Sequence, residues 1–293
     1  MRELVQHIGV GRYPVERIKH YLLLVPEAPV LLVLLLIAWA YDFPPVVGGF
    51  AALVVTFFVI RLFCLASTVQ ELGLARYEQA DRLARTALRL HPWSPDALAL
   101  RGNTQLLQGN DEAAETLLRD AVRLAPDHAA NHAALATVLL ARGNYAAGRE
   151  HATWALRLDD GSPYAVQQLA WLALHREHDP RKSRRIIDSI DLNAHPAAVR
   201  ASLLVLRSEA QIMEGDLDEA RETVCAVEMA LPHCPNPQQA ELCFHLGRLH
   251  ALLGDDGCAY FRRSVRLDPR GRWAHAAWRA AVNPAEYGSR VAS

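Results

Sequence analysis

The sequence lacks an excess of charge of either sign: 31 Lys and Arg residues against 32 Asp and Glu residues give a formal net charge of −1 and a pI near 6.9. Nucleic-acid binding depends on a basic face that neutralises phosphates, so the composition gives no reason to expect a nucleic-acid partner. Charged residues make up only 22% and hydrophobic residues 51%, which excludes a disordered chain. The 293 residues can therefore bury a core, in one large domain or two ordinary ones.

Cysteine is also scarce, with five residues in the whole chain. An odd number in a chain of this size does not make a disulfide framework, so we expect reduced thiols and a reducing compartment. Cys225, Cys234 and Cys243, with His233 and His245 nearby, invite a zinc interpretation. Their spacing is unlike the close C-x2-4-C pairs of structural zinc sites. We therefore predict core and loop cysteines without a metal.

Sequence motifs typical of catalytic sites are absent as well. There is no phosphate-cradling GxxxxGK[ST], and the pair His128 and His132 reads HAANH, without the glutamate of HExxH. Nothing assembles a nucleophile, a base and an oxyanion hole, and the basic run at residues 179–185 is typical of a solvated face. The prediction is a protein that is not an enzyme and has no cofactor.

What the sequence does have is two long apolar runs near its start, uncharged over residues 28–41 and 43–60. They predict a transmembrane helical hairpin at 27–66, whose first arm is short for a span and either crosses a thinned bilayer or stays re-entrant. The second arm continues past an arginine that can snorkel to the headgroups. The predicted anchor residues are two interfacial aromatic residues, a double proline in the turn and the arginine of the second arm: Trp39, Tyr41, Pro44, Pro45 and Arg61.

The cations on both sides of this hairpin predict its orientation. Four precede it and four follow it, whereas the turn has none. We expect the protein in the inner (cytoplasmic) membrane. By the positive-inside rule, its two termini and its repeat domain lie in the cytoplasm. Residues 1–26 have the pattern of an amphipathic leader on the membrane surface. A cleaved signal peptide is disfavoured, because this leader is too long and a second apolar run follows.

From about residue 76 the chain repeats itself every 34 residues. The recurring end signals are ALRLHP at 87–92, AVRLAP at 121–126 and ALRLDD at 155–160. A small residue stands seven positions before each: Ala80, Ala114 and Gly148. Such a period predicts a solenoid.

These repeats resemble the tetratricopeptide repeat (TPR) family, with the best match at residues 95–128. The resemblance implies antiparallel helix pairs, about six in all over residues 67–271. Five follow residue 94, the third of these five degraded around residues 179–182, and a sixth pair precedes them. The first pair would use the end of the second membrane arm, giving one helix of roughly 29 residues, or ~44 Å. A capping helix at 272–282 and a tail at 283–293 would follow. The expected fold is all-α.

The resemblance also implies a concave groove lined by the first helix of each pair. The groove positions transferred from the family are Asn103, Leu106, Thr137, Tyr164, Gln167, Trp171, His175, Val205, Glu209, Phe244 and Arg248. Ala99 stands where chaperone-binding members have a clamp lysine, so a terminal carboxylate is a poor fit. The aromatic residues favour an apolar or aromatic helix or an extended peptide. The alternative is that some of them simply pack between repeats.

The functional prediction is a membrane-anchored TPR scaffold or adaptor that binds protein partners at the cytoplasmic membrane face and contacts the lipid bilayer through its hairpin. Two alternatives keep this architecture: a permanent accessory subunit of a larger membrane protein complex, and a transient assembly factor or chaperone-like adaptor. A third, from another class, is an enzyme or metal protein that uses the Cys and His residues near the C-terminal end.

Overall fold

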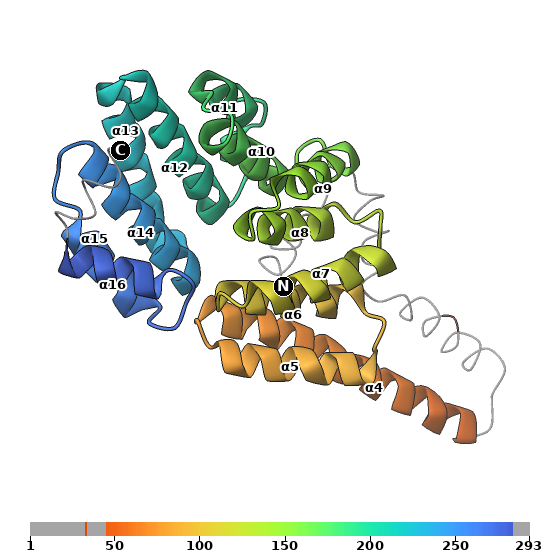
Figure 1. The fold of residues 1–293 in the computed structure, drawn as a ribbon. Coiled ribbons are helices and arrows are strands. Elements are labelled where there is room, and N and C mark those ends of the chain that lie inside the picture. The colour runs from red at the N-terminus through yellow and green to blue at the C-terminus, as the bar shows by residue number, and fades with distance from the viewer. Residues whose placement is uncertain (1–32, 34–44, 284–293) are drawn as a thin grey trace.

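A computed structural model describes residue 33 and residues 45–283, and this part of the chain is helical, without a β-strand (Figure 1). The helices are α4 (Pro45–Gly73), α5 (Tyr77–Leu90), α6 (Pro95–Leu107), α7 (Asp111–Leu124), α8 (Ala129–Ala141), α9 (Tyr145–Leu158), α10 (Pro163–His175), α11 (Pro180–Ile187), α12 (Ala197–Glu214), α13 (Leu217–Ala230), α14 (Asn236–Leu252), α15 (Cys258–Leu267) and α16 (Ala274–Val282). Two 3-10 turns, Leu192–Ala194 and Leu231–His233, join some of them.

Consecutive helices pack as pairs, from α4 with α5 to α14 with α15, and α16 covers the last pair. Small residues allow the close crossing within each pair: a Cβ on Gly102 of α6 would lie 2.7 Å from Leu118 Cγ of α7. Gly109 and Gly143 end first helices with φ of 82° and 80°, a conformation that glycine adopts without strain. The expected all-α array of helix pairs is confirmed.

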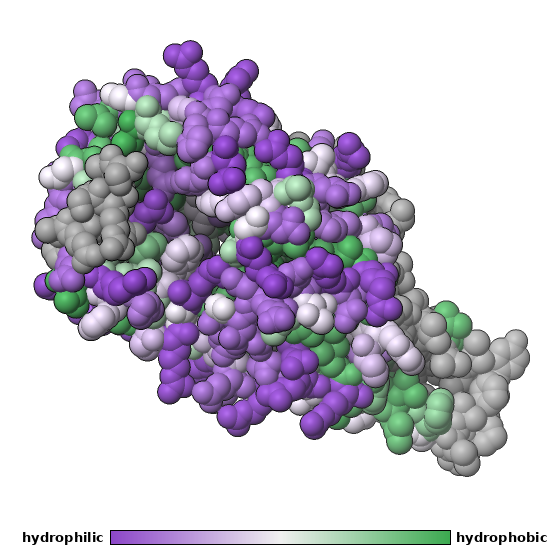
Figure 2. Space-filling model, viewed as in Figure 1, coloured by the Kyte–Doolittle hydropathy of each residue, from purple (hydrophilic) through white to green (hydrophobic). Residues whose placement is uncertain are grey.

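Helix α4 has two halves with different surroundings. It is 29 residues long, as predicted. Its second half belongs to the solenoid, where Cys64 and Leu65 are buried against Ala87 and Ala97. Its first half projects from the body, and Figure 2 shows apolar surface there. Among the described residues, α4 alone is long and apolar enough to cross a membrane, over Gly48–Gly73.

The other parts of the predicted hairpin lie outside the described residues. These parts include Trp39, Tyr41 and Pro44; the predicted leader at 1–26 and the tail from residue 284 also lie outside the described residues. Pro45 is described, and it begins α4 as its first residue. The hairpin therefore stays a prediction, of which the structure shows the second arm as a helix.

The predicted snorkelling of Arg61 is wrong. Its side chain is 3% exposed, and its Nη2 donates a hydrogen bond to Ser94 Oγ at 2.9 Å. Ser94 is the N-cap of α6, so the arginine joins the first helix pair to the second. The sequence could not show this, because the partner lies on the side of α4 that the solenoid covers.

The degraded pair, α10 with α11, is the fourth in the array and keeps a shortened second helix. Helix α11 has only eight residues. Asp179 caps it by accepting a hydrogen bond from Lys182 N–H at 2.8 Å, and Pro180 occupies its first turn, where a missing N–H costs nothing. The basic run is thus a helix start, and Arg184 within it is paired with Glu214 and Glu219.

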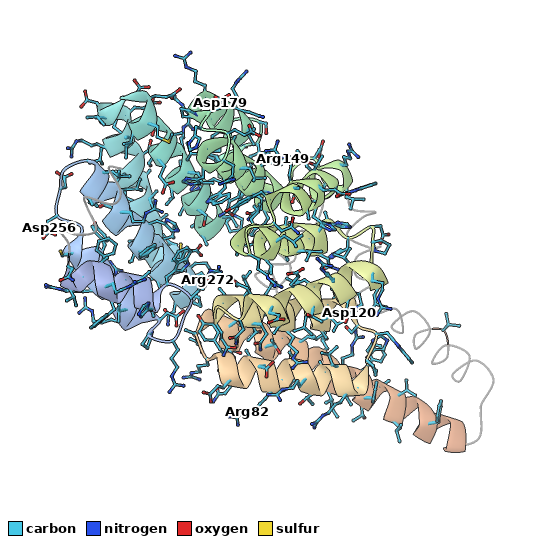
Figure 3. The ribbon with its side chains drawn as sticks, viewed as in Figure 1. Arg82, Asp120, Arg149, Asp179, Asp256 and Arg272 are labelled. Atoms are coloured by element: carbon cyan, nitrogen blue, oxygen red, sulfur yellow. The ribbon has the colours of Figure 1, made fainter. Side chains whose placement is uncertain are left out.

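The two ends of the solenoid meet. Arg272, in the loop between α15 and α16, donates its backbone N–H to the carbonyl of Leu107 at 2.8 Å, and its guanidinium pairs with both carboxylate oxygens of Asp111 (Figure 3). Asp268, in the same loop, accepts a hydrogen bond from the hydroxyl of Tyr77, the first residue of α5. These partners are 161 to 191 residues apart in sequence. The helix pairs and this contact therefore encircle the concave side.

Candidate functional site

A cavity of ≈280 Å³ lies on the concave side, at the centre of the closed solenoid. The first helices of five pairs, α6, α8, α10, α12 and α14, contribute its walls, together with the loop after α15. Its apolar wall includes Leu106, Leu140, Val205, Leu206 and Leu242; its polar wall includes Thr137, Gln167, Gln168, Glu241, His245 and Arg272. Apolar walls with a few convergent polar groups are typical of binding sites.

The lining includes two tryptophans, Trp171 from α10 and Trp273 from the loop between α15 and α16. Trp171 stacks on Tyr145 with ring centroids 6.2 Å apart and touches His175 at 5.0 Å. It is held in place by packing against the core around Leu174 and Ile187. Such a tryptophan offers a rigid apolar surface to a ligand at little entropic cost.

Beside the cavity, three helices bring charged side chains to one buried carboxylate. Glu209 of α12 is 5% exposed. Its Oε2 lies 3.1 Å from His175 Nε2 of α10, and its Oε1 lies 3.4 Å from Arg248 Nη1 of α14. His245, which lines the cavity, places Nδ1 4.0 Å from Oε1. The cluster fixes the relative position of three consecutive first helices.

The protonation states in this cluster follow from burial and charge. Burial opposes ionisation of Glu209, but the hydrogen bond from His175 and the charge of Arg248 outweigh it and lower the pKa of Glu209 to about 2. Burial, followed by the nearby Arg248, lowers the pKa of His245 to about 4. Near neutral pH the cluster therefore holds a carboxylate, an arginine and a neutral His245.

The structure divides the predicted groove residues into three groups. Gln167 and Trp171 line the cavity, as do Leu106, Thr137 and Val205. His175, Glu209 and Arg248 form the charged cluster beside it. The remaining three are Asn103, Tyr164 and Phe244.

Those three residues lie away from the cavity lining. Phe244 is 4% exposed and packs in a core with Phe261, stacked on Trp273 at 4.9 Å. Tyr164 packs against the alanines between α8, α9 and α10. Asn103 is half-buried on α6. For Phe244 and Tyr164 the alternative of packing between repeats describes what the structure shows.

Sequence reasoning missed the residues that close the cavity. Glu241, Asp268, Arg272 and Trp273 all line it. Burial raises the pKa of Glu241, against the opposing effects of Arg272 and the Trp273 side chain. Trp273 was expected only as part of a cap. No repeat-level signal marks these residues, because their place depends on the summed twist of all the helix pairs.

Cys225, Cys234 and Cys243 do not form a cluster. Cys225 is exposed, whereas Cys234 and Cys243 are buried. Burial raises the pKa of Cys243 to about 11, so its thiol stays protonated. In the part of the chain that the structure describes, no three His, Cys, Asp or Glu side chains are placed to hold a metal ion.

Comparison with known proteins points to one repeat family. Residues 72–138 match the family model described as tetratricopeptide repeat. No curated protein sequence matches the chain. Among solved structures, the APC/C hetero-tetramer Cut9–Hcn1 is similar over 87% of this chain and 52% of that one, with 14% identity and a TM-score of 0.56. At this identity the likeness supports the fold alone.

Two further structures are similar over parts of the chain. An O-GlcNAc transferase mutant from Thermobaculum terrenum is 29% identical over 45% of this chain, with a TM-score of 0.43. PilF from Pseudomonas aeruginosa is 19% identical over 77% of this chain, with a TM-score of 0.49. The chain covers 26% of the transferase and 99% of PilF.

Proposed function

We propose that this chain, whose residues 72–138 match the tetratricopeptide repeat family, is a non-enzymatic scaffold that holds a protein partner in its central cavity while α4 anchors it in a membrane. The cavity carries the first part of the proposal, since the first helices of five pairs converge on it. Its ≈280 Å³ is small for a whole helix, whose backbone and side chains span about 10 Å. An extended peptide segment, or a few side chains of a partner, fits better.

The exposed half of α4 supports the anchor. Phe50, Leu53 and Phe63 are each about two thirds exposed, at 65%, 66% and 67%. An apolar surface of this kind is costly in water and favourable in lipid. The hydroxyl of Thr56 donates to the carbonyl of Ala52 at 2.8 Å, so this polar group is satisfied within the helix, as a lipid environment requires.

The cations that flank the apolar region support an inner-membrane location with the solenoid and both termini in the cytoplasm. A permanent accessory subunit and a transient assembly factor would share this arrangement. Purification in detergent separates them, because a resident subunit co-purifies in constant stoichiometry with other membrane proteins and an assembly factor does not.

We expect carbonate washing to leave the full-length protein in the membrane pellet. Carbonate removes proteins held by charge or by other proteins, whereas a hydrophobic span resists it. A chain that begins at Gln70 lacks the exposed half of α4, and we expect it in the supernatant. The measurement is the distribution of each chain between pellet and supernatant. Full-length protein in the supernatant would contradict the anchor.

We expect Trp171→Ala to weaken partner binding about thirtyfold, a loss of ~2 kcal/mol typical of an interface tryptophan. Partners that co-purify with the wild-type protein should be titrated against the purified variant. The matched control is Tyr164→Ala, which removes aromatic packing in a cluster of which no residue lines the cavity. It should lower the melting temperature and leave partner affinity unchanged. Equal affinities of wild type and Trp171→Ala would move the binding site away from the cavity.

A further inference from the structure

The level at which α4 leaves the solenoid can be read from its side chains. From Cys64 and Leu65 onwards the helix is buried against α5 and α6. Leu62 and Phe63, on another face of the helix, are exposed at 49% and 67%, whereas Arg61 and Phe58 are only 3% and 9% exposed. The sixteen residues from Pro45 to Ile60 would extend a further ~24 Å at 1.5 Å per residue, most of the ~30 Å hydrocarbon core of a bilayer. We place the boundary between lipid and solenoid at Arg61, because its hydrogen bond to Ser94 ties this level of α4 to the next helix pair.

The loop between α5 and α6, residues 91–94, lies at this same level. Ser94, at its end, accepts the hydrogen bond from Arg61, which fixes the loop beside the point where α4 emerges. Trp93, the neighbouring residue, is 71% exposed, although a tryptophan is costly to leave in water. Tryptophan is enriched where hydrocarbon meets headgroups, because its ring is apolar and its indole N–H is polar.

We propose that Trp93 and the loop at residues 91–94 rest in the headgroup layer of the membrane that α4 enters. This inference rests on the proposed anchoring of α4 and goes beyond it. One helix alone would leave the solenoid free to tilt about its exit point. A second contact at Trp93, from a loop tied to α4 through Arg61, fixes the tilt and so the direction in which the solenoid extends from the bilayer.

The test places a fluorescent probe at each of three exposed positions in the full-length protein, in nanodiscs of phosphatidylcholine and phosphatidylglycerol. The substitutions are Val59→Cys on α4, Trp93→Cys, and Trp278→Cys on α16, at positions that are 60%, 71% and 56% exposed. Cys225 and Cys258 are first replaced by serine, since the other three cysteines are buried. Quenchers are iodide in water and nitroxides attached to lipid, either at the headgroup or deep in the acyl chain.

We expect the deep nitroxide to quench the probe at 59, the headgroup nitroxide to quench the probe at 93, and only iodide to quench the probe at 278. If the probe at 93 behaves like the one at 278 while the one at 59 is quenched by lipid, α4 is anchored and the proposed loop contact is absent. If neither iodide nor either lipid nitroxide quenches the probe at 93, protein covers this position and the proposed lipid contact is wrong. If lipid does not quench the probe at 59, the anchoring proposal itself fails.

Discussion

Replacing Glu209 by glutamine lowers the unfolding free energy at pH 7 by about 3 kcal/mol, the largest effect we expect from a single polar change. Loss of one partner from a buried ion pair leaves the other charge without compensation, which typically costs 3 to 5 kcal/mol. The lower end applies because the Arg248 side chain is 24% exposed. For a chain of this size the melting temperature should fall by about 5 °C, measured by circular dichroism or calorimetry.

The control for this variant is Asp120→Asn, which removes an exposed pair with Arg123 (Figure 3). Because that pair is solvated, its loss should change stability by less than about 0.5 kcal/mol. Equal effects of the two variants would show that burial of Glu209 does not strengthen its interactions.

The effect of Glu209→Gln should also depend on pH. The native pKa of about 2 lies below the usual 4.5, so folding favours the carboxylate. Its contribution is fully present above pH 4.5 and is lost as pH falls towards 2. The unfolding free energies of wild type and variant should therefore converge between about pH 5 and pH 2. The other charged groups that face Glu209 are His175, His245 and Arg248, and His245 gains its proton in this range, so the difference between the curves is the quantity to compare. A constant difference would contradict the lowered pKa of Glu209.

Gly257→Ala should destabilise the protein by about 3 kcal/mol or more through steric overlap. A Cβ on Gly257 would lie 2.1 Å from the carbonyl oxygen of Gly247 and 2.8 Å from its carbonyl carbon. These are backbone atoms of α14, so relief requires moving α15 away from α14. The melting temperature should fall by about 5 °C or more.

The matched control is Gly161→Ala, because the nearest atom to its Cβ would be Asp159 Oδ1 at 3.7 Å, an ordinary contact. It should leave the melting temperature unchanged or raise it slightly, since alanine restricts the unfolded chain. A Gly257→Ala protein as stable as this control would show that α14 and α15 can separate freely.

The repeat pattern was enough to predict the helix pairs and the 29-residue α4, because both depend on local features: end signals, small residues at the crossings and an uninterrupted apolar run. Gln167 and Trp171, two of the predicted groove residues, line the cavity, and their role in binding stays a prediction. The repeat pattern could not predict the burial of Arg61 or the contact of Arg272 with Asp111, because each depends on how whole helices lie in space. Phe244 occupies a repeat position that was expected to face the concave groove, but the ring of Trp273 stacks on it.

The contact between the two ends of the solenoid changes how the protein should unfold. A linear array of repeats frays from either terminus, because a terminal repeat has only one neighbour to lose. Here the loop after α15 touches the turn before α7, so the last helix pair cannot detach without also breaking the link from Arg272 to Asp111. The array then has the connectivity of a ring, and its repeats should lose structure together in one cooperative transition rather than one after another.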